Sequence, residues 1–475
     1  MQVNAADLPN LRRALSFVLL ALLAISLSFV LGTTHTPYAD LVRQGDALAE
    51  RTYRTAAIAA YREAAQLRPD DPLPHIQQAR VYLDWGRPGA ALDALTEAKR
   101  READVVTLAQ LRLRAHVARE DWPAVVEQAQ ALRRQTPQDR DVQHALANAY
   151  VQMRDWDAAR RAYEALLQAD PTEPIAHERL GALLAGQDAI AIQHLYTAQT
   201  ELARQLLDTL QAEDTVGDPA YTSALLGRTL MAAEQWALAV RHLARAVEIA
   251  PHYADAHVYL GHALDQMALP KEAYPHLIRG VALAPDSVPA RTLLGLHYDR
   301  QGDYAAARTE YEAAYDLDPQ SAALCVEIGQ TWIAERRYNV AEIWFREALD
   351  LRPNDPVYWE ILTRFYLEHE LTIEERAIEA AETLLALAPE SALAHDLRGW
   401  AAFQVGDDAA AAEFLQRALA LNPYLASAHY HQGLLYHAQG ARENARAAFT
   451  RALDLDTSSN LTPRVQRSLD ELDRL

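Results

Sequence analysis

Residues 254–287 read ADAHVYLGHALDQMALPKEAYPHLIRGVALAPDS, and residues 288–321 read VPARTLLGLHYDRQGDYAAARTEYEAAYDLDPQS. Both stretches have the same length, and small residues recur in them at the same places. Leucine and glycine occupy places seven and eight, alanine place twenty and proline place thirty-two. Apolar residues between them recur every three to four positions, which predicts two amphipathic helices in each stretch. Proline then ends the second helix, because it cannot continue a helix interior.

This spacing extends along most of the chain. Successive prolines mostly lie one such stretch apart. The series consists of Pro137 and Pro171, and then of Pro251, Pro285, Pro319, Pro353, Pro389 and Pro423. Within the second group only Pro389 breaks the spacing, because it comes two positions late. A period of this length indicates a repeat architecture. We place twelve copies, at residues 38–71, 72–105, 106–139, 140–173, 174–219, 220–253, 254–287, 288–321, 322–355, 356–391, 392–425 and 426–459.

The pattern closely resembles the tetratricopeptide repeat family. The resemblance implies an all-α, right-handed superhelical solenoid of about twelve helix-turn-helix repeats, because one unit cannot bury its apolar faces alone. The first five copies follow the consensus less closely than later ones. We therefore predict four parts: residues 1–33, a first block at 34–219 with repeats 1–5, a second block at 220–459 with repeats 6–12, and a capping helix at 460–475.

The capping helix is predicted from the stretch LTPRVQRSLDELDRL, which follows Asn460. Leu461, Val465, Leu469 and Leu472 fall on one face of such a helix. The last repeat of a solenoid needs a cover of this kind, with a polar outer side.

Composition excludes several classes of function. The formal net charge is −20, which disfavours nucleic acid as a partner because such binding needs a basic surface. Cys325 is the single cysteine, so neither an intramolecular disulfide nor a cysteine-based zinc cluster can form. No phosphate-binding loop, dinucleotide fingerprint, zinc-protease or serine-hydrolase motif is present. We therefore expect no enzyme, cofactor, metal site or small-molecule substrate.

The N-terminal segment predicts a membrane anchor. The run from Ala14 to Leu31 carries no charge and has about the length that spans a bilayer as a helix. Arg12 and Arg13 precede the run, so the N-terminus should lie in the cytoplasm and the repeats outside it. A cleaved signal peptide, with cleavage near Thr33, is the alternative. The predicted location is the bacterial cytoplasmic membrane, crossed once. The basic residues are almost all arginine, which suggests a GC-rich source.

Partner-binding residues follow from the resemblance. In this family places two, five, nine and twelve of each first helix face the inner surface of the solenoid. The residues that we select at these places are His262, Leu296, Gln330, Arg364, Trp400, Phe403, Tyr430 and Leu434. The last four would form an apolar-aromatic patch, a typical binding anchor. The alternative is that the end of the solenoid or its cap covers the patch.

Three hypotheses for function remain. The leading one is a membrane-anchored, non-catalytic scaffold that holds protein partners, as a peptide or helix in the groove, for cell-envelope, pilus, secretion or polysaccharide assembly. The second is a soluble periplasmic or secreted carrier, released by signal cleavage. The third is an enzyme, for which no stretch of domain length is left outside the repeats.

Repeat five departs furthest from the period. Two periods after Pro171 would place a proline at position 239, but the proline of the series is Pro251, twelve positions late. The inserted stretch lies near residues 185–199. Gly186 can end the first helix of repeat five, and helical spacing then predicts one long second helix over residues 188–212. The insertion is either an outward bulge without a role or a joint between the two blocks, with His194, Tyr196 and Thr197 as contact residues.

Overall fold

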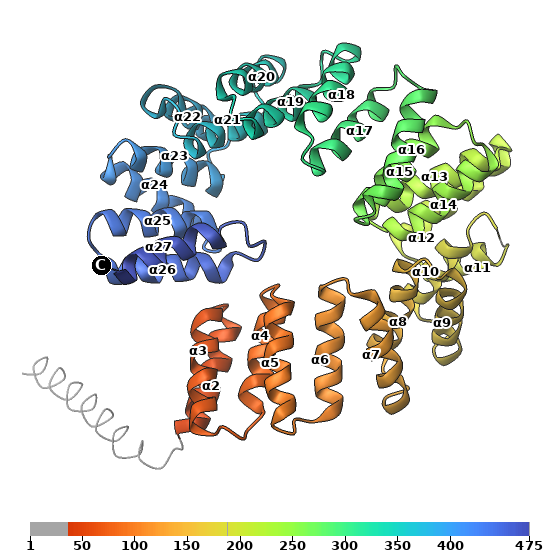
Figure 1. Cartoon of the computed structure of the whole chain (residues 1–475), viewed down its shortest axis with the longest axis horizontal. Coiled ribbons are helices and arrows are strands. Elements are labelled where there is room, and N and C mark those ends of the chain that lie inside the picture. Colours follow the sequence, from red (N-terminus) through yellow and green to blue (C-terminus); the bar gives the residue numbers. More distant parts are fainter. Residues whose placement is uncertain (1–36, 188, 475) are drawn as a thin grey trace, which may run out of the picture. The chain divides into compact units, whose positions relative to one another are not determined.

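The structure is a computed structural model that describes residues 37–187 and 189–474. Within these residues it contains 26 α-helices, one short π-helix and no strand (Figure 1). The chain divides into two compact units, and the boundary falls after Arg119, inside the third repeat. The all-α fold of paired helices is thus confirmed, while the predicted division into blocks at residue 219 stays a prediction.

Twelve helices open the repeats and twelve close them. The first helices are α2 (Pro37–Glu50), α4 (Leu73–Asp84), α6 (Val105–Ala118), α8 (Arg140–Gln152), α10 (Pro174–Leu184), α13 (Pro219–Ala232), α15 (Ala254–Gln266), α17 (Val288–Arg300), α19 (Ala322–Ala334), α21 (Pro356–Glu368), α23 (Ala392–Gln404) and α25 (Ala426–Ala438). The second helices are α3 (Arg54–Leu67), α5 (Pro88–Arg100), α7 (Trp122–Gln135), α9 (Trp156–Ala169), α11 (Ile190–Ala198), α14 (Trp236–Ile249), α16 (Pro270–Leu283), α18 (Tyr304–Leu317), α20 (Tyr338–Leu351), α22 (Ile378–Leu387), α24 (Asp408–Leu421) and α26 (Arg442–Leu455). The π-helix η1 (Ile373–Ala377) precedes α22. Two helices stand outside the pairs, α12 (Glu201–Val216) and α27 (Thr462–Arg474).

The turn between the paired helices shares a positive φ at one place in most repeats. In eleven repeats the residue at place fifteen has a positive φ, although only four of these residues are glycine; they are Thr52, Gly86, Glu120, Arg154, Glu234, Ala268, Gly302, Arg336, Glu370, Gly406 and Gly440. An aspartate or serine before many of the helices accepts a hydrogen bond from a backbone N–H of the first turn, as Asp155 and Ser321 do. Such N-caps satisfy donors that have no partner inside the helix.

Glycine at place eight sets the distance between the paired helices. A Cβ atom added to Gly295 would lie 2.6 Å from the ring of Tyr311, and one added to Gly329 would lie 2.6 Å from the ring of Phe345. Both rings belong to place twenty-four of the same repeat and are almost completely buried. The absence of a side chain at place eight therefore lets the two helices approach closely.

The fifth repeat has three helices, so the prediction of one long helix over residues 188–212 is wrong. The second helix, α11, ends at Ala198 because Gln199 adopts a left-handed conformation with φ 54°. Thr200 then caps α12, since its Oγ1 accepts a hydrogen bond from the N–H of Ala203 at 3.1 Å. The first helix, α10, ends at Leu184, and Gly186, predicted to end it, follows two residues later with φ 65°. Residue 188, the predicted start of the long helix, lies outside the described residues.

The extra helix α12 changes which helices pack against each other in this part of the chain. α12 contacts α10 on one side and α13 on the other (Figure 1). Beyond it, α14 contacts α8 of the fourth repeat, and buried His242 lies 2.8 Å from the carbonyl oxygen of Ala182 in α10. Helices of the fourth, fifth and sixth repeats thus share one apolar core.

A last helix, α27, follows the twelfth repeat at the C-terminus. The C-terminal cap is confirmed as α27, whose Val465 is fully buried and whose Leu472 is nearly so. Asp456 stabilises its start, because its carboxylate accepts hydrogen bonds from the backbone N–H groups of Leu461 and Thr462. The predicted membrane segment at residues 14–31 lies outside the described residues. Within residues 37–187 and 189–474, no helix is long and apolar enough to span a bilayer.

Candidate partner-binding site

Six of the eight predicted site residues form a row, with one residue in each of six consecutive repeats. Place nine of six first helices, from α15 to α25, is occupied by His262, Leu296, Gln330, Arg364, Trp400 and Leu434. Gln330 is exposed, Trp400 is buried and the other four are half-buried. We call these six residues the place-nine row. They are chemically mixed, so the row offers apolar, amide and cationic groups rather than one continuous apolar stripe.

The aromatic patch is only partly open. The ring of Trp400 is 9% exposed and stacks on the imidazole of His431 with centroids 4.4 Å apart. Phe403, Tyr430 and Leu434 keep part of their surface exposed, and the ring of Tyr430 lies 5.8 Å from that of Phe449 in α26. His431 of the last repeat therefore covers Trp400, whereas the other three residues keep accessible surface.

Two polar members of the row are held by neighbours. His262 lies edge-on to the indole of Trp236, with centroids 6.0 Å apart, and burial lowers the pKa of its imidazole to about 4. It is therefore neutral at physiological pH. Arg364 forms an ion pair with Glu360 one turn earlier on α21, at 2.9 Å. Exposed pairs of this kind are worth little, so Arg364 can exchange Glu360 for an acidic group on a partner.

Two buried histidine–aspartate pairs join neighbouring first helices, and the sequence did not reveal them. His297 of α17 lies 2.8 Å from Asp265 of α15, and His431 of α25 lies 2.7 Å from Asp396 of α23. All four side chains are almost inaccessible in these pairs. Each pair fixes one repeat against the next, because a buried polar group that loses its partner is costly. Sequence spacing could not find them, since the partners come from different repeats.

Histidines at place four have a structural role. His177, His257, His395 and His429 each lie within hydrogen-bond distance, through Nε2, of the proline carbonyl six residues earlier. In repeats five and seven a second histidine faces the first, and the Nδ1 atoms are 2.8 and 3.1 Å apart. One Nδ1 must donate and the other accept, which makes each pair a hydrogen bond inside the repeat. His194, predicted as a contact residue, is the partner of His177.

No metal site emerges from these groups. Within residues 37–187 and 189–474, three or more histidine, cysteine, aspartate or glutamate side chains do not gather where they could hold an ion. Cys325 is buried, and burial raises the pKa of its thiol to about 11. A thiol in this state is a poor nucleophile.

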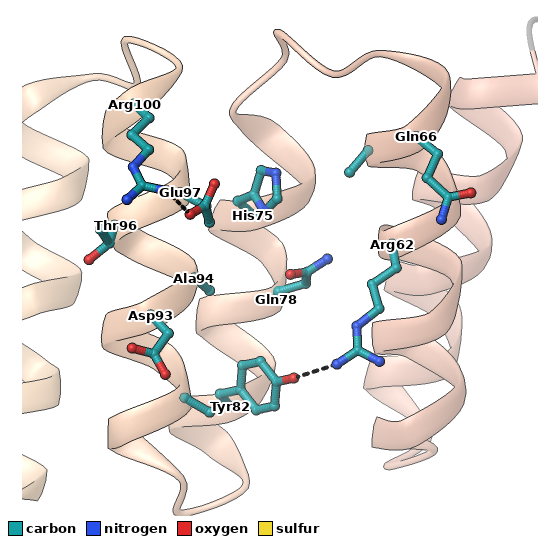
Figure 2. Close-up of a pocket in the computed structure, with 12 residues that line it drawn as sticks. Arg62, Gln66, His75, Gln78, Tyr82, Asp93, Ala94, Thr96, Glu97 and Arg100 are labelled. Atoms are coloured by element: carbon teal, nitrogen blue, oxygen red, sulfur yellow. Dashed lines mark hydrogen bonds and ion pairs between the residues drawn. The ribbon is translucent and has the colours of Figure 1, made fainter.

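A polar groove lies in the unit that ends at Arg119. It has a volume of about 620 Å³ and lies between α3, α4 and α5. Figure 2 shows Arg62 of α3 reaching Tyr82 of α4, while Glu97 and Arg100 pair on α5. Among the described residues, the buried Nε2 of Gln78 has no hydrogen-bond partner. The groove offers hydrogen-bonding groups of both kinds, which suit a polar segment.

Stacked helix pairs with a glycine or alanine where the two helices of a pair meet define a class of repeat scaffold. Comparison of the sequence with models of known families identifies the family. Models of the tetratricopeptide repeat match residues 140–183, 230–296, 292–356, 375–426 and 426–459. The chain is a tetratricopeptide repeat protein. Proteins of this family bind protein and peptide partners and are usually non-catalytic.

Three solved structures with similar helix pairs match different shares of this chain. Yeast Tom70 is 13% identical, over 92% of this chain and 95% of that chain, with a TM-score of 0.42. The Pseudomonas aeruginosa pilF protein is 19% identical, over 47% of this chain and 96% of that chain, with a TM-score of 0.39. YrrB, described as a TPR protein with an unusual peptide-binding site, is 18% identical, over 42% of this chain and 97% of that chain, with a TM-score of 0.34. None of these likenesses bears on the partner of this chain.

Proposed function

We propose that the protein is a non-catalytic scaffold that holds a segment of a partner protein along the place-nine row, with its helix pairs stacked as a right-handed superhelix. The observation that carries the proposal is the partial exposure of the row: all of its residues except the buried Trp400 keep accessible surface, and their side chains differ in chemistry at one place of successive repeats. A row of this kind can read several residues of a peptide or helix in sequence.

A position-specific cross-linking experiment tests the site. A photoreactive phenylalanine analogue replaces Gln330 on α19, and in a matched chain it replaces Ile343 on α20, which is 64% exposed. We expect a discrete cross-linked partner from position 330 and none from position 343. Leu434→Asp should reduce the cross-link from position 330, because it places a charge in the same row. Equal yields from both positions would contradict the proposed site.

We further propose that residues 14–31 anchor the chain in the bacterial cytoplasmic membrane, with the repeats on the far side. The support is the uncharged run preceded by Arg12 and Arg13. Assembly of a cell-envelope, pilus, secretion or polysaccharide system is the corresponding role. N-terminal sequencing of the mature protein tests the anchor: a chain that begins near Thr33 would instead be the soluble carrier.

A further inference from the structure

A second polar cavity is lined by residues of repeats four to six, the part of the chain that contains the extra helix of repeat five. It lies far along the chain from the groove of Figure 2. It measures about 500 Å³ and lies where α14 meets the end of α8, the start of α9 and the turn after α10. We call it the Arg241 pocket, and its lining residues are Arg154, Trp156, Gln187, Val240, Arg241, Ala244, Arg245 and Glu248. Cavities of this size are typical of small-molecule sites.

The first arginine of the pocket is fixed without being neutralised. Arg241 donates from Nε to the carbonyl oxygen of Leu183 and from a terminal nitrogen to the side-chain oxygen of Gln187, both at 3.1 Å. Its guanidinium also lies over the ring of Trp156, 5.1 Å from the centroid. All three partners are uncharged, so they hold the guanidinium in place and leave its positive charge unbalanced.

The second arginine is free to bind. Arg245 follows Arg241 by one helical turn, and among the described residues it has neither a hydrogen-bond nor an ion-pair partner. Burial, and next the neighbouring charge of Arg245, lower the pKa of Arg241. The third arginine does not contribute in the same way, because Arg154 is paired through both terminal nitrogens with Glu272, at 2.8 and 3.0 Å.

Two carboxylates oppose this positive charge only in part. Glu248 lines the pocket but is exposed and forms no ion pair with the arginines in the described part of the chain. Asp157 raises the pKa of Arg241 but is the smallest of the influences on it. Two guanidinium charges in a protein of net charge −20 therefore point to a doubly negative ligand. A phosphate monoester carries about −1.5 to −2 at pH 7, whereas a carboxylate carries only one charge.

We propose that the Arg241 pocket binds the phosphate group of a small phosphate monoester between Arg241 and Arg245. Guanidinium groups bind phosphate through paired N–H donors. The ring of Trp156 borders the cavity and supplies a flat apolar surface for the organic part of the ligand. The site does not depend on the place-nine row, so it stands whether or not that row binds a partner.

Calorimetric titration of the full-length protein in detergent, at constant ionic strength, tests the site with three probes. They are phenyl phosphate, inorganic phosphate and benzoate. We expect phenyl phosphate to bind most tightly, inorganic phosphate more weakly, and benzoate not measurably. No heat from phenyl phosphate at 10 mM, on the order of the weakest useful affinity, would overturn the proposal, as would equal binding of benzoate.

Three variants separate the pocket from general charge effects. Arg245→Gln should weaken phenyl phosphate at least tenfold, and it removes no structural bond because Arg245 makes none among the described residues. Glu248→Gln should strengthen binding several-fold, since it deletes the carboxylate that lines the pocket. Arg134→Gln, at an exposed position of α7, should change nothing. If Arg245→Gln and Arg134→Gln bind alike while circular dichroism shows both folded, the pocket is not the site.

Discussion

At the scale of single residues, the contact between the two helices of a repeat rests on a missing side chain. Seven glycines at place eight face the side chain at place twenty-four, and the eighth, Gly181, faces Leu195 of α11 in repeat five. Since protein interiors are packed as densely as organic crystals, one added methyl group has no free volume to enter. Glycine is therefore required here by space and not by backbone conformation.

Gly329→Ala should lower the free energy of unfolding by about 1–3 kcal/mol, the usual cost of overpacking. The added Cβ would lie 2.6 Å from Phe345, so the ring or the helix must shift. Gly89→Ala is the control, because a Cβ there meets nothing within 4 Å. It should be neutral or slightly stabilising, since alanine favours a helix over glycine. Urea unfolding followed by circular dichroism measures both; equal stabilities would refute the packing argument.

A second residue-scale prediction concerns pH. Burial lowers the pKa of His242 to about 4 from 6.5. Below pH 6.5 the unfolded chain takes up a proton that the folded chain accepts only near pH 4, so stability is lost as the pH falls through this range. Between pH 7.5 and pH 5 the loss from this one group is about 2 kcal/mol.

The variant His242→Gln isolates this contribution. Glutamine can still donate to the carbonyl of Ala182, which His242 contacts at 2.8 Å, but it does not titrate. The unfolding free energy of the variant should fall by about 2 kcal/mol less than that of the original chain between pH 7.5 and pH 5. Parallel pH profiles of the two proteins would rule out His242 as a source of acid sensitivity.

At the scale of elements, the helix pairs could be predicted because each repeat carries its own turn and packing signals. The period fixes where helices start and end, and small residues fix which faces meet. The break between α11 and α12 could not be predicted from apolar spacing, because that spacing continues in phase across Gln199. Its signal was Thr200, a capping residue followed by Glu201 at the start of a helix.

This break predicts an unusual substitution effect. Gln199 has φ 54°, a conformation that glycine adopts without cost, so Gln199→Gly should raise stability by about 0.5–1 kcal/mol. Gln193→Gly, at an exposed position inside α11, should lower it by about 1 kcal/mol, because glycine is a poor helix former. Thermal unfolding of the two variants should shift in opposite directions. If both destabilise, α11 and α12 are one continuous helix in solution.

At the scale of the whole molecule, the sequence predicts the local order of the array better than its binding surfaces. The period gives each residue a place within its repeat, and this located the place-nine row. It could not show that Trp400 is buried under His431, because this contact joins different repeats. Nor could it show the Arg241 pocket, which joins the fourth, fifth and sixth repeats through contacts between α8, α10 and α14.

An array built on contacts between neighbouring repeats should lose structure locally when its end is damaged. Val465 is the fully buried residue through which α27 covers the last repeat. Val465→Asp buries a charge without a partner, at a cost of several kcal/mol, and should detach α27. In a solenoid this loss is felt first by the adjacent repeat, since stability is roughly a sum of repeat and interface contributions. Amide hydrogen exchange should therefore quicken in α25 and α26 and stay unchanged in α8 and α9.

The control Gln466→Asp introduces the same group on the exposed side of α27 and should leave exchange in α25 and α26 as it was. Uniformly faster exchange throughout residues 120–474 would show instead that these repeats unfold as one cooperative block.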